Sequence, residues 1–402
     1  MPTAYLCVPA YPILPERRGQ AHQAAQRLAA AAGCTLVESP LLDRAFPGQG
    51  AWLPAEDRLA DLREAAGHDL MIAARGGYGC LHLLDDLPRL PPVVGFSDLT
   101  ILHAARWAAG ERGGVYGMMP AAAYGPRAMA TACALLAGQY AEYGNSASKR
   151  EILGAVSPVR GDPVSAEVLG EASPSSPGED RVESPTQAEL ARQNPAELAR
   201  QNPAELALGA PRQTQPSPAQ SSPAQGEQGL ASPRFDVSGV RVLRLGRAAG
   251  PAFPACLRVL AGLCGTKFQP DLSGCVLCLE DIDEKPYQID RDLEQLHRAG
   301  VFRGIVGLVF GGFPLAVPPG IPAQSGPTHA DIAQRWADRL GVPSVFGLHF
   351  GHDCDPLALP VGGWIELTAE ASGHWRITVT GQAAAVTTLR VPEAPSIKES
   401  SR

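Results

Sequence analysis

Short apolar runs that end directly in glycine-rich or polar turns place the strictest limit on the fold of this chain. Leu70–Ala74 leads into the sequence RGGYG at 75–79, and Pro92–Gly95 leads into FSD at 96–98. Between such runs the sequence predicts helices, over Gln20–Ala32, Pro54–Ala66 and Thr100–Ala109. Strands that alternate with helices favour a mainly parallel sheet covered by helices.

The alternation of strands and helices resumes after residue 234. Strands are predicted over Gly274–Leu279, Gly304–Phe310 and Ser344–Gly347, with helices over Asp290–Ala299 and Ala330–Leu340 and a terminal hairpin over Gly363–Thr380. We therefore predict an α/β protein of two domains. Residues 1–145 would form an N-terminal, mainly parallel sheet flanked by helices, and 234–392 a smaller C-terminal α/β or α+β domain.

The segment 146–233 differs in composition from both predicted domains. Proline, serine, glutamine and glutamate dominate it, and it contains the octapeptides AELARQNP, AELARQNP and AELALGAP over 188–211. A repeat this short, closed by proline each time, cannot build a packed solenoid. The composition predicts a disordered or loosely helical insertion, with a docking segment as the alternative, and 393–402 is predicted to be a disordered tail.

Charge and cysteine content narrow the classes of protein that fit. The formal net charge is −7 without a block of basic residues, which argues against a nucleic-acid partner. No window approaches the ~20 apolar residues needed to span a bilayer, and Met1–Pro15 lacks a basic region typical of a signal peptide. Nine cysteines, an odd number mostly in apolar contexts, indicate reduced thiols. We expect a cytoplasmic protein without a membrane partner.

Ser97 is the strongest candidate for a nucleophile. A strand, a Gly-x-Ser-Asp turn and a helix would lift its hydroxyl out at the carboxyl end of the strand, as in a nucleophile elbow. The alternative is that Ser97 caps the helix that follows. If Ser97 is the nucleophile, the backbone N–H of Asp98 is placed to bind an oxyanion.

The glycine loop at 75–79 also follows a strand. Its glycines allow the backbone to approach a ligand closely. The spacing matches neither of the common phosphate-binding patterns, and a plain tight turn remains an alternative. Beside a nucleophilic Ser97, Gly76 or Gly77 would supply the second oxyanion donor.

Two further residues could complete a catalytic group. Glu280 ends the apolar run 275–279 and is placed to orient an imidazole, although its acidic neighbours could instead bind a divalent metal or lie in solvent. His352, in a glycine-flanked loop, is a candidate base, with a packed surface histidine as the alternative. Cys275 and Cys278 form a CxxC without a second pair, so no metal site is predicted.

Four segments together resemble the LD-carboxypeptidase family, serine peptidases related to the microcin C self-immunity peptidases. They are ARGGYG at 74–79, GFSDLTILH at 95–103, LCLEDIDEKPYQIDRDLEQLHRAG at 277–300, and FGLHFGH with LPVG within 346–362. The resemblance covers most of 1–145 and 235–390 and skips the repeats. It implies a two-domain fold, often a homodimer, that uses no cofactor.

The resemblance also implies roles for single residues. Ser97 would be the nucleophile, Glu280 the carboxylate and His352 the base of a Ser-Glu-His triad. The oxyanion hole would use backbone N–H groups of Gly76 or Gly77 and of Asp98. The substrate would be a small peptidoglycan-derived peptide, a muropeptide, from which the terminal D-alanine is cleaved during murein recycling.

Two other functions stay open. The same chemistry could act on a peptide–nucleotide antibiotic conjugate. Family members usually carry a Gly-Gly-Asn-Leu segment before the glutamate, whereas Leu245–Leu257 here is LGRAAGPAFPACL, and this departure and the large insertion favour a protein that binds peptides without cleaving them. The exact substrate and the purpose of the repeats do not follow from the sequence.

Overall fold

The computed structural model describes residues 1–44, 53–139, 141–145, 234–315 and 326–380. These residues belong to one unit, formed by Met1–Ile152 together with Leu230–Arg402. The segment 146–233 and the tail 393–402 lie outside the described residues, so their predicted disorder remains a prediction.

A six-stranded sheet carries the first part of the chain, as the sequence predicts. Its strands run in the order β13-β5-β4-β3-β1-β2, and all pairs are parallel except β13 with β5. Their bounds are Thr3–Cys7 (β1), Thr35–Glu38 (β2), Leu70–Ala73 (β3), Val93–Val94 (β4), Gly114–Tyr116 (β5) and Leu359–Pro360 (β13). All four residues of β3 are buried, as expected of a parallel strand covered on both faces.

Helices pack around this sheet and begin and end at the signals in the sequence. They are α1 (Arg18–Ala31), α2 (Ala55–Ala65), α3 (Thr100–Ala108) and α4 (Pro126–Leu136), with short 3₁₀ turns at Pro15–Arg17 (η1), Pro40–Asp43 (η2), Cys80–Asp86 (η3) and Ser97–Leu99 (η4). The chain leaves α1 through Gly33 at φ 70°, and Pro54 precedes α2. The helices α1, α2 and α3 match the predicted ones to within two residues at each end, whereas α4 was not predicted.

A nine-stranded mixed sheet carries most of the second part. Its order is β7-β6-β15-β14-β9-β10-β11-β12-β8. The bounds are Ala141–Gly144 (β6), Arg234–Asp236 (β7), Arg241–Arg244 (β8), Gly246–Cys256 (β9), Val276–Glu280 (β10), Gly307–Gly311 (β11), Ser344–Leu348 (β12), Trp364–Ala369 (β14) and Trp375–Val379 (β15). The predicted terminal hairpin is confirmed as β14 and β15.

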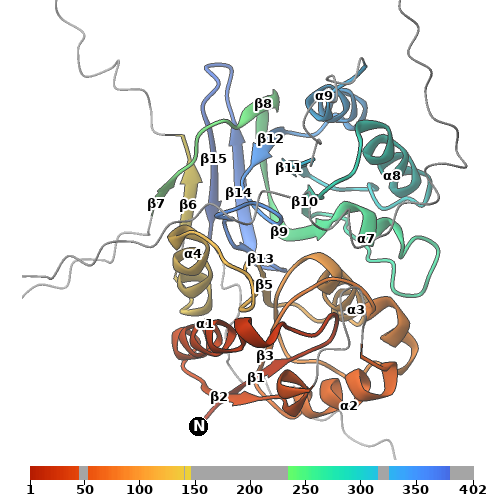
Figure 1. Cartoon of the computed structure of the whole chain (residues 1–402). Helices are drawn as coiled ribbons and strands as arrows, with labels where there is room; N and C mark the ends of the chain where they lie inside the picture. Colours follow the sequence, from red (N-terminus) through yellow and green to blue (C-terminus); the bar gives the residue numbers. More distant parts are fainter. Residues whose placement is uncertain (45–52, 140, 146–233, 316–325, 381–402) are drawn as a thin grey trace, which may run out of the picture. The chain divides into compact units, whose positions relative to one another are not determined.

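Three helices lie side by side against the parallel part of this sheet (Figure 1). They are α7 (Leu257–Ala261), α8 (Pro286–Arg298) and α9 (His329–Leu340). Thr328 and Asp331 form a reciprocal capping box at the start of α9, and Gly341 ends it at φ 72°. The helix α8 begins four residues before the predicted start, at Pro286, because proline is well suited to the first position of a helix.

Two strands pair across the boundary that the sequence suggests between its two parts. β6 comes from the first part but pairs with β15 in the nine-stranded sheet. β13 comes from the second part but pairs with β5 in the six-stranded sheet. The two sheets therefore share chain segments, and their buried side chains form one continuous hydrophobic core.

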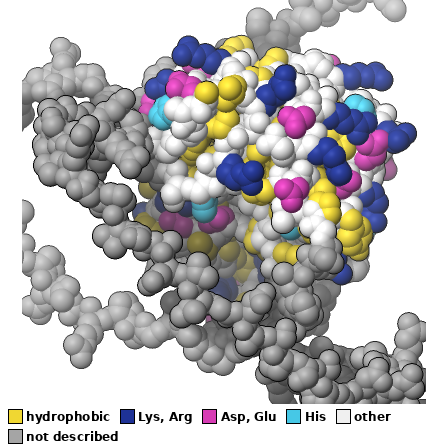
Figure 2. All heavy atoms as spheres, turned by 90° about the horizontal axis from the view of Figure 1, so that it is seen from above, with side chains coloured by type: hydrophobic (Ala, Val, Ile, Leu, Met, Phe, Trp, Pro, Cys, Tyr) yellow, Lys and Arg dark blue, Asp and Glu magenta, His cyan; other side chains and the backbone are white. Residues whose placement is uncertain are grey.

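The surface is mixed in charge on the face that Figure 2 shows. Basic and acidic side chains are interspersed there rather than gathered by sign. Among the described residues, no helix is long and apolar enough to cross a membrane.

Candidate active site

Ser97 is the first residue of η4, on a strained turn that follows β4. Its φ is 65°, and within the described residues only Asp283 shares a positive φ among non-glycine residues. A non-glycine residue in this conformation costs about 1–2 kcal/mol, because Cβ approaches the carbonyl oxygen. The turn therefore has the strained strand-to-helix geometry of a nucleophile elbow, although Leu99 stands where that motif has its second glycine.

Buried side chains packed against the Ser97 turn hold its backbone in place. A β-carbon at Gly95 would lie 3.1 Å from Leu99 Cγ, so the helix packs tightly on the strand end. His103 Nε2–H donates to the Gly95 carbonyl oxygen at 2.9 Å. Burial lowers the pKa of His103 to about 4, so this imidazole is neutral at neutral pH and serves as a structural donor.

The structure brings Ser97, His352 and Glu280 into one hydrogen-bonded chain. Ser97 Oγ–H donates to His352 Nε2 at 3.1 Å, and His352 Nδ1–H donates to Glu280 Oε2 at 2.8 Å. The second bond fixes the tautomer in which Nε2 is free to accept a proton. The geometry is that of a nucleophile, a base and an orienting carboxylate.

Glu280 is fully buried at the end of β10 and is held by three donors. Besides His352 Nδ1–H, the backbone N–H of His352 donates to Oε2 at 3.0 Å, and the Tyr116 hydroxyl donates to Oε1 at 2.7 Å. A buried carboxylate held by this many donors is fixed in position. The glutamate can therefore act as a rigid support for the imidazole.

Glycine is required next to His352 for this contact to form. Gly351 has φ 73°, and a β-carbon there would lie 2.1 Å from Glu280 Cδ. On the other side, a β-carbon at Gly311 would lie 2.8 Å from Glu280 Cβ. Both glycines therefore make room for the buried carboxylate, and the Gly-His pair noted in the sequence has a steric reason.

The charge of Glu280 acts on His352. Burial alone would lower the pKa of His352, but the Glu280 charge and hydrogen bond, with Asp281 and Asp283 nearby, raise it above its ordinary value. A base next to a carboxylate binds the serine proton more readily, which is the property that general-base catalysis needs.

Asp281, the next carboxylate of the acidic cluster, binds backbone N–H groups and not the imidazole. Its carboxylate accepts two backbone N–H groups. One is that of Arg258, at the start of α7, at 2.8 Å, and the other is that of the next residue, Ile282, at 2.9 Å. Burial, followed by the charge of Glu280, raises the pKa of Asp281 to about 7. Within the described part of the chain, no group of three or more His, Cys, Asp or Glu side chains is arranged to hold a metal ion.

The glycine loop lies directly against the serine turn. A β-carbon on Gly76 would be 3.0 Å from Ser97 Cβ, and one on Gly77, at φ 123°, would be 2.4 Å from the Tyr11 ring. The buried Asp98 carboxylate accepts the Cys80 backbone N–H at 2.9 Å, which ties the end of the loop to the turn. The three predicted oxyanion residues are thus neighbours, and their binding role remains a prediction.

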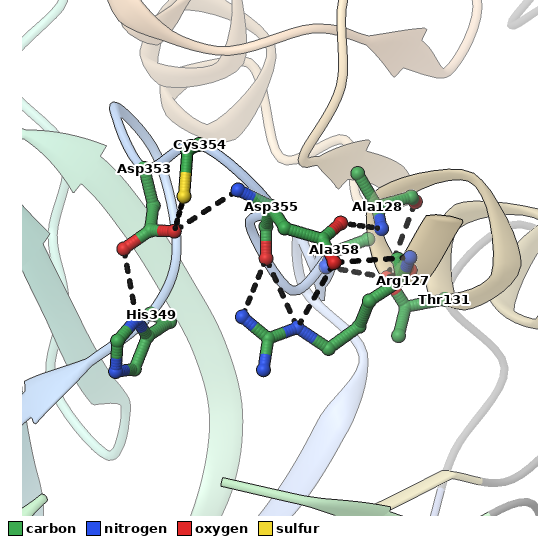
Figure 3. Close-up of polar contacts among 8 residues, drawn as sticks. All are labelled: Arg127, Ala128, Thr131, His349, Asp353, Cys354, Asp355 and Ala358. Atoms are coloured by element: carbon green, nitrogen blue, oxygen red, sulfur yellow. Dashed lines mark hydrogen bonds and ion pairs between the residues drawn. The ribbon is translucent and has the colours of Figure 1, made fainter. Parts of the chain in front are cut away.

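The loop that carries His352 is fastened to α4 (Figure 3). Asp355 accepts the backbone N–H groups of Ala128 at 2.8 Å and Arg127 at 3.3 Å, and the Arg127 side chain donates to the Asp355 carbonyl oxygen at 2.6 and 3.0 Å. Before it, Asp353 accepts from His349 Nδ1 at 2.8 Å. After it, Ala358 N–H donates to Thr131 Oγ1 at 2.9 Å.

Replacing Asp355 with alanine should lower the free energy of unfolding by about 1–2 kcal/mol, because the first turn of α4 loses its carboxylate cap. Urea denaturation measures this change. The matched control is Asp85→Ala, which removes an exposed partner of Lys267 and should cost less than about 0.5 kcal/mol. Equal losses in the two variants would show that Asp355 is not a cap.

A cavity of about 930 Å³ opens over Ser97 and His352. Its wall is largely apolar and includes Tyr11, Ile13 and Tyr124, while Arg75 and Asp283 add charge. This size fits a short peptide or a comparable ligand. The hydroxyl and the imidazole are thus available to a molecule bound there.

The fold and this site together define an α/β protein of the serine-hydrolase type. Residues 5–117 match the model of the LD-carboxypeptidase N-terminal domain, and 249–367 match that of the LD-carboxypeptidase C-terminal domain. Together these matches span more than half of the sequence. The chain belongs to the LD-carboxypeptidase family.

Individual relatives agree with this assignment. A Bacillus subtilis protein named "Probable murein peptide carboxypeptidase" is 32% identical over 117 residues, which is 29% of this chain and 36% of that protein. The chain aligns with about two fifths of the length of the first curated relatives that it matches.

Two solved structures have a similar fold. The muramoyltetrapeptide carboxypeptidase from Oxalobacter formigenes has a TM-score of 0.59 at 18% identity, covering 93% of this chain and 98% of its own. The microcin C7 self-immunity protein, in the apo state of an inactive mutant, has a TM-score of 0.59 at 15% identity, covering 95% of this chain and 96% of its own.

Tyr116 was not among the predicted site residues. Its hydroxyl nevertheless donates to Glu280 Oε1 and also accepts the Ser97 backbone N–H at 3.4 Å. One signal could have revealed it. Tyr116 ends a strand next to β4, and the carboxyl ends of parallel strands meet at one edge of a sheet.

Proposed function

We propose that this protein is a serine-type LD-carboxypeptidase that releases the terminal D-alanine from peptidoglycan-derived tetrapeptides in the cytoplasm. The observation that carries the proposal is the hydrogen-bonded chain from Ser97 through His352 to Glu280, open to a cavity and placed against the glycine loop. Family membership and the name of the Bacillus subtilis relative support the substrate class.

Each step of the reaction has a group suited to it. Ser97 Oγ attacks the carbonyl carbon before the D-alanine while its proton passes to His352 Nε2. Backbone N–H groups of the glycine loop and of Asp98 stabilise the oxyanion. The C–N bond then breaks as His352 returns the proton to the departing amine, and D-alanine leaves. Water, activated by His352, hydrolyses the acyl-enzyme.

Mass-spectrometric detection of D-alanine tests the proposal directly. Incubation of the purified protein with a muropeptide tetrapeptide should release D-alanine and leave the tripeptide. A tetrapeptide whose last residue is L-alanine serves as the control and should be cleaved much more slowly. A folded protein that releases no D-alanine from the tetrapeptide would contradict this function.

A second candidate keeps the chemistry and changes the substrate to a peptide–nucleotide conjugate. The volume of the cavity and its aromatic walls, Tyr11 and Tyr124, favour it. A microcin C7 self-immunity protein of the same fold was solved with glutamyl sulfamoyl guanosine, at a TM-score of 0.55 and 14% identity. Comparing kcat/KM for the tetrapeptide and for an aminoacyl-nucleotide mimic distinguishes the two functions.

The rate should depend on pH through His352. The imidazole must be neutral to accept the serine proton, and its raised pKa keeps it protonated to a higher pH than an ordinary histidine. The value of kcat/KM should therefore fall as the pH decreases through a midpoint above roughly 6.5. A profile measured between pH 5 and 9 locates this midpoint, and one clearly below 6.5 would contradict the assignment of His352 as the base.

A further inference from the structure

Arg75, the first residue of the glycine loop, has no assigned role in the mechanism above. It lines the same cavity as Ser97 and His352 and is only partly buried. Its guanidinium carbon lies 5.7 Å from the centre of the Tyr11 ring. Because an arginine side chain is always charged and carries five N–H donors, it needs an anion or several acceptors nearby.

Within the described residues, Arg75 has no carboxylate at ion-pair distance, unlike most charged groups around it. Asp353, which also lines the cavity, is bonded to His349 at 2.8 Å. The second arginine of the wall, Arg17, donates to Gln20 Oε1 at 3.2 Å. Neither arginine therefore has a carboxylate partner among the described residues, and Arg75 is the one of the two whose guanidinium makes no hydrogen bond there.

The position of Arg75 relative to Ser97 fits one part of a peptide. A β-carbon on Gly76, its neighbour, would lie 3.0 Å from Ser97 Cβ, and adjacent Cα atoms are about 3.8 Å apart. In a peptide cut before its last residue, the terminal carboxylate carbon lies at most about 4 Å from the scissile carbonyl carbon, across one nitrogen and one Cα. An arginine side chain that starts beside the oxyanion loop can reach this carboxylate.

We propose that the Arg75 guanidinium binds the C-terminal carboxylate of the substrate and thereby restricts cleavage to the last residue. The planar guanidinium can pair with both carboxylate oxygens, and the apolar wall around it strengthens the pairing. Tyr11 packs against the cation from one side. This inference rests on the proposed function and adds to it the group that makes the enzyme an exopeptidase.

The test compares two substrates that differ only at this carboxylate. One is the tetrapeptide with a free C-terminal acid, and the other is the same peptide ending in D-alaninamide. For the wild type, kcat/KM should be about 10- to 100-fold higher for the acid, the range expected for hydrogen bonds to a charged group. In Arg75→Gln this preference should disappear, mainly through KM for the acid, while Arg75→Lys should keep part of it.

Arg17→Gln is the matched control, because it removes the same charge from the same cavity and should keep the preference. The ratio of kcat/KM for the acid to kcat/KM for the amide is measured on one preparation of each variant. A fraction of misfolded protein lowers both values equally and cannot change this ratio. A wild type without preference for the acid, or an Arg75→Gln variant that retains the preference, would overturn the inference while leaving D-alanine release intact.

A measurement of peptide binding without turnover distinguishes the carboxylate site proposed here from the proposed catalytic function. In the Ser97→Ala background, calorimetry should show tighter binding of the acid than of the amide, and the difference should vanish when Arg75→Gln is added. If the wild type releases no D-alanine but this difference is present, the carboxylate site stands and the catalytic proposal fails. If neither peptide binds, both fail.

Discussion

Replacing Ser97 with alanine is expected to lower kcat for D-alanine release by at least about 10³-fold, because no other group at the cavity replaces the nucleophile. Alanine keeps the β-carbon and the positive φ of the turn. The variant loses one hydrogen bond to His352, which contributes about 0.5–1.5 kcal/mol. Thermal unfolding should therefore stay within a few degrees of the wild type, while turnover is lost.

A fluorophosphonate probe gives an independent measure of the same serine. It should label the wild type at Ser97 and leave the Ser97→Ala variant unlabelled, because only an activated hydroxyl reacts. Ser273→Ala is the control, since that serine is exposed and its hydroxyl donates to Asp271 at 2.7 Å and not to a residue of the triad. Undiminished turnover in Ser97→Ala would refute the nucleophile. A wild type that is neither labelled nor active would instead be a peptide-binding family member.

The second large effect is expected at Glu280. Glutamine has the same shape, but its amide carries no charge and can present an N–H group to His352 Nδ1 instead of an acceptor. The imidazole then loses its orientation and the stabilisation of its protonated form. We expect kcat/KM to fall by about 10³- to 10⁴-fold in Glu280→Gln, the range seen when a triad carboxylate becomes an amide.

Asp281→Asn is the matched control for this prediction. The two carboxylates are adjacent in sequence, and both are buried, but Asp281 binds the backbone at the start of α7 and not the imidazole. Its substitution should change kcat/KM by less than about tenfold. Equal losses in the two variants would mean that the total negative charge of the cluster matters, and that Glu280 does not act by orienting His352.

Local sequence patterns were sufficient for much of the fold. Apolar runs that end in glycine-rich or polar turns predicted β3, β4 and β10, because a strand buried on both faces needs an uninterrupted apolar sequence. The same runs placed Ser97 and Glu280 at strand ends. The meeting of Glu280 with His352 followed only from the resemblance, since it depends on long-range packing.

Other features have no local signature. β9 contains Pro251 and Pro254, which ordinarily argue against a central strand. It forms nonetheless, with antiparallel β14 along its first half and parallel β10 along its second. The pairing of β13 with β5 and the bond from Tyr116 to Glu280 likewise join residues far apart in the sequence. No periodicity within one segment could have indicated them.

The separation of the triad along the chain also determines when the site can exist during synthesis. Ser97 and His352 are 255 residues apart, and the loop that carries His352 is held by α4, through Asp355, and by β13, which pairs with β5. At ~5–20 residues per second a ribosome needs roughly 10 to 50 s to cover that interval. Throughout this time the nascent chain holds a serine without its base, so the unfinished polypeptide has no means of attacking the peptides around it.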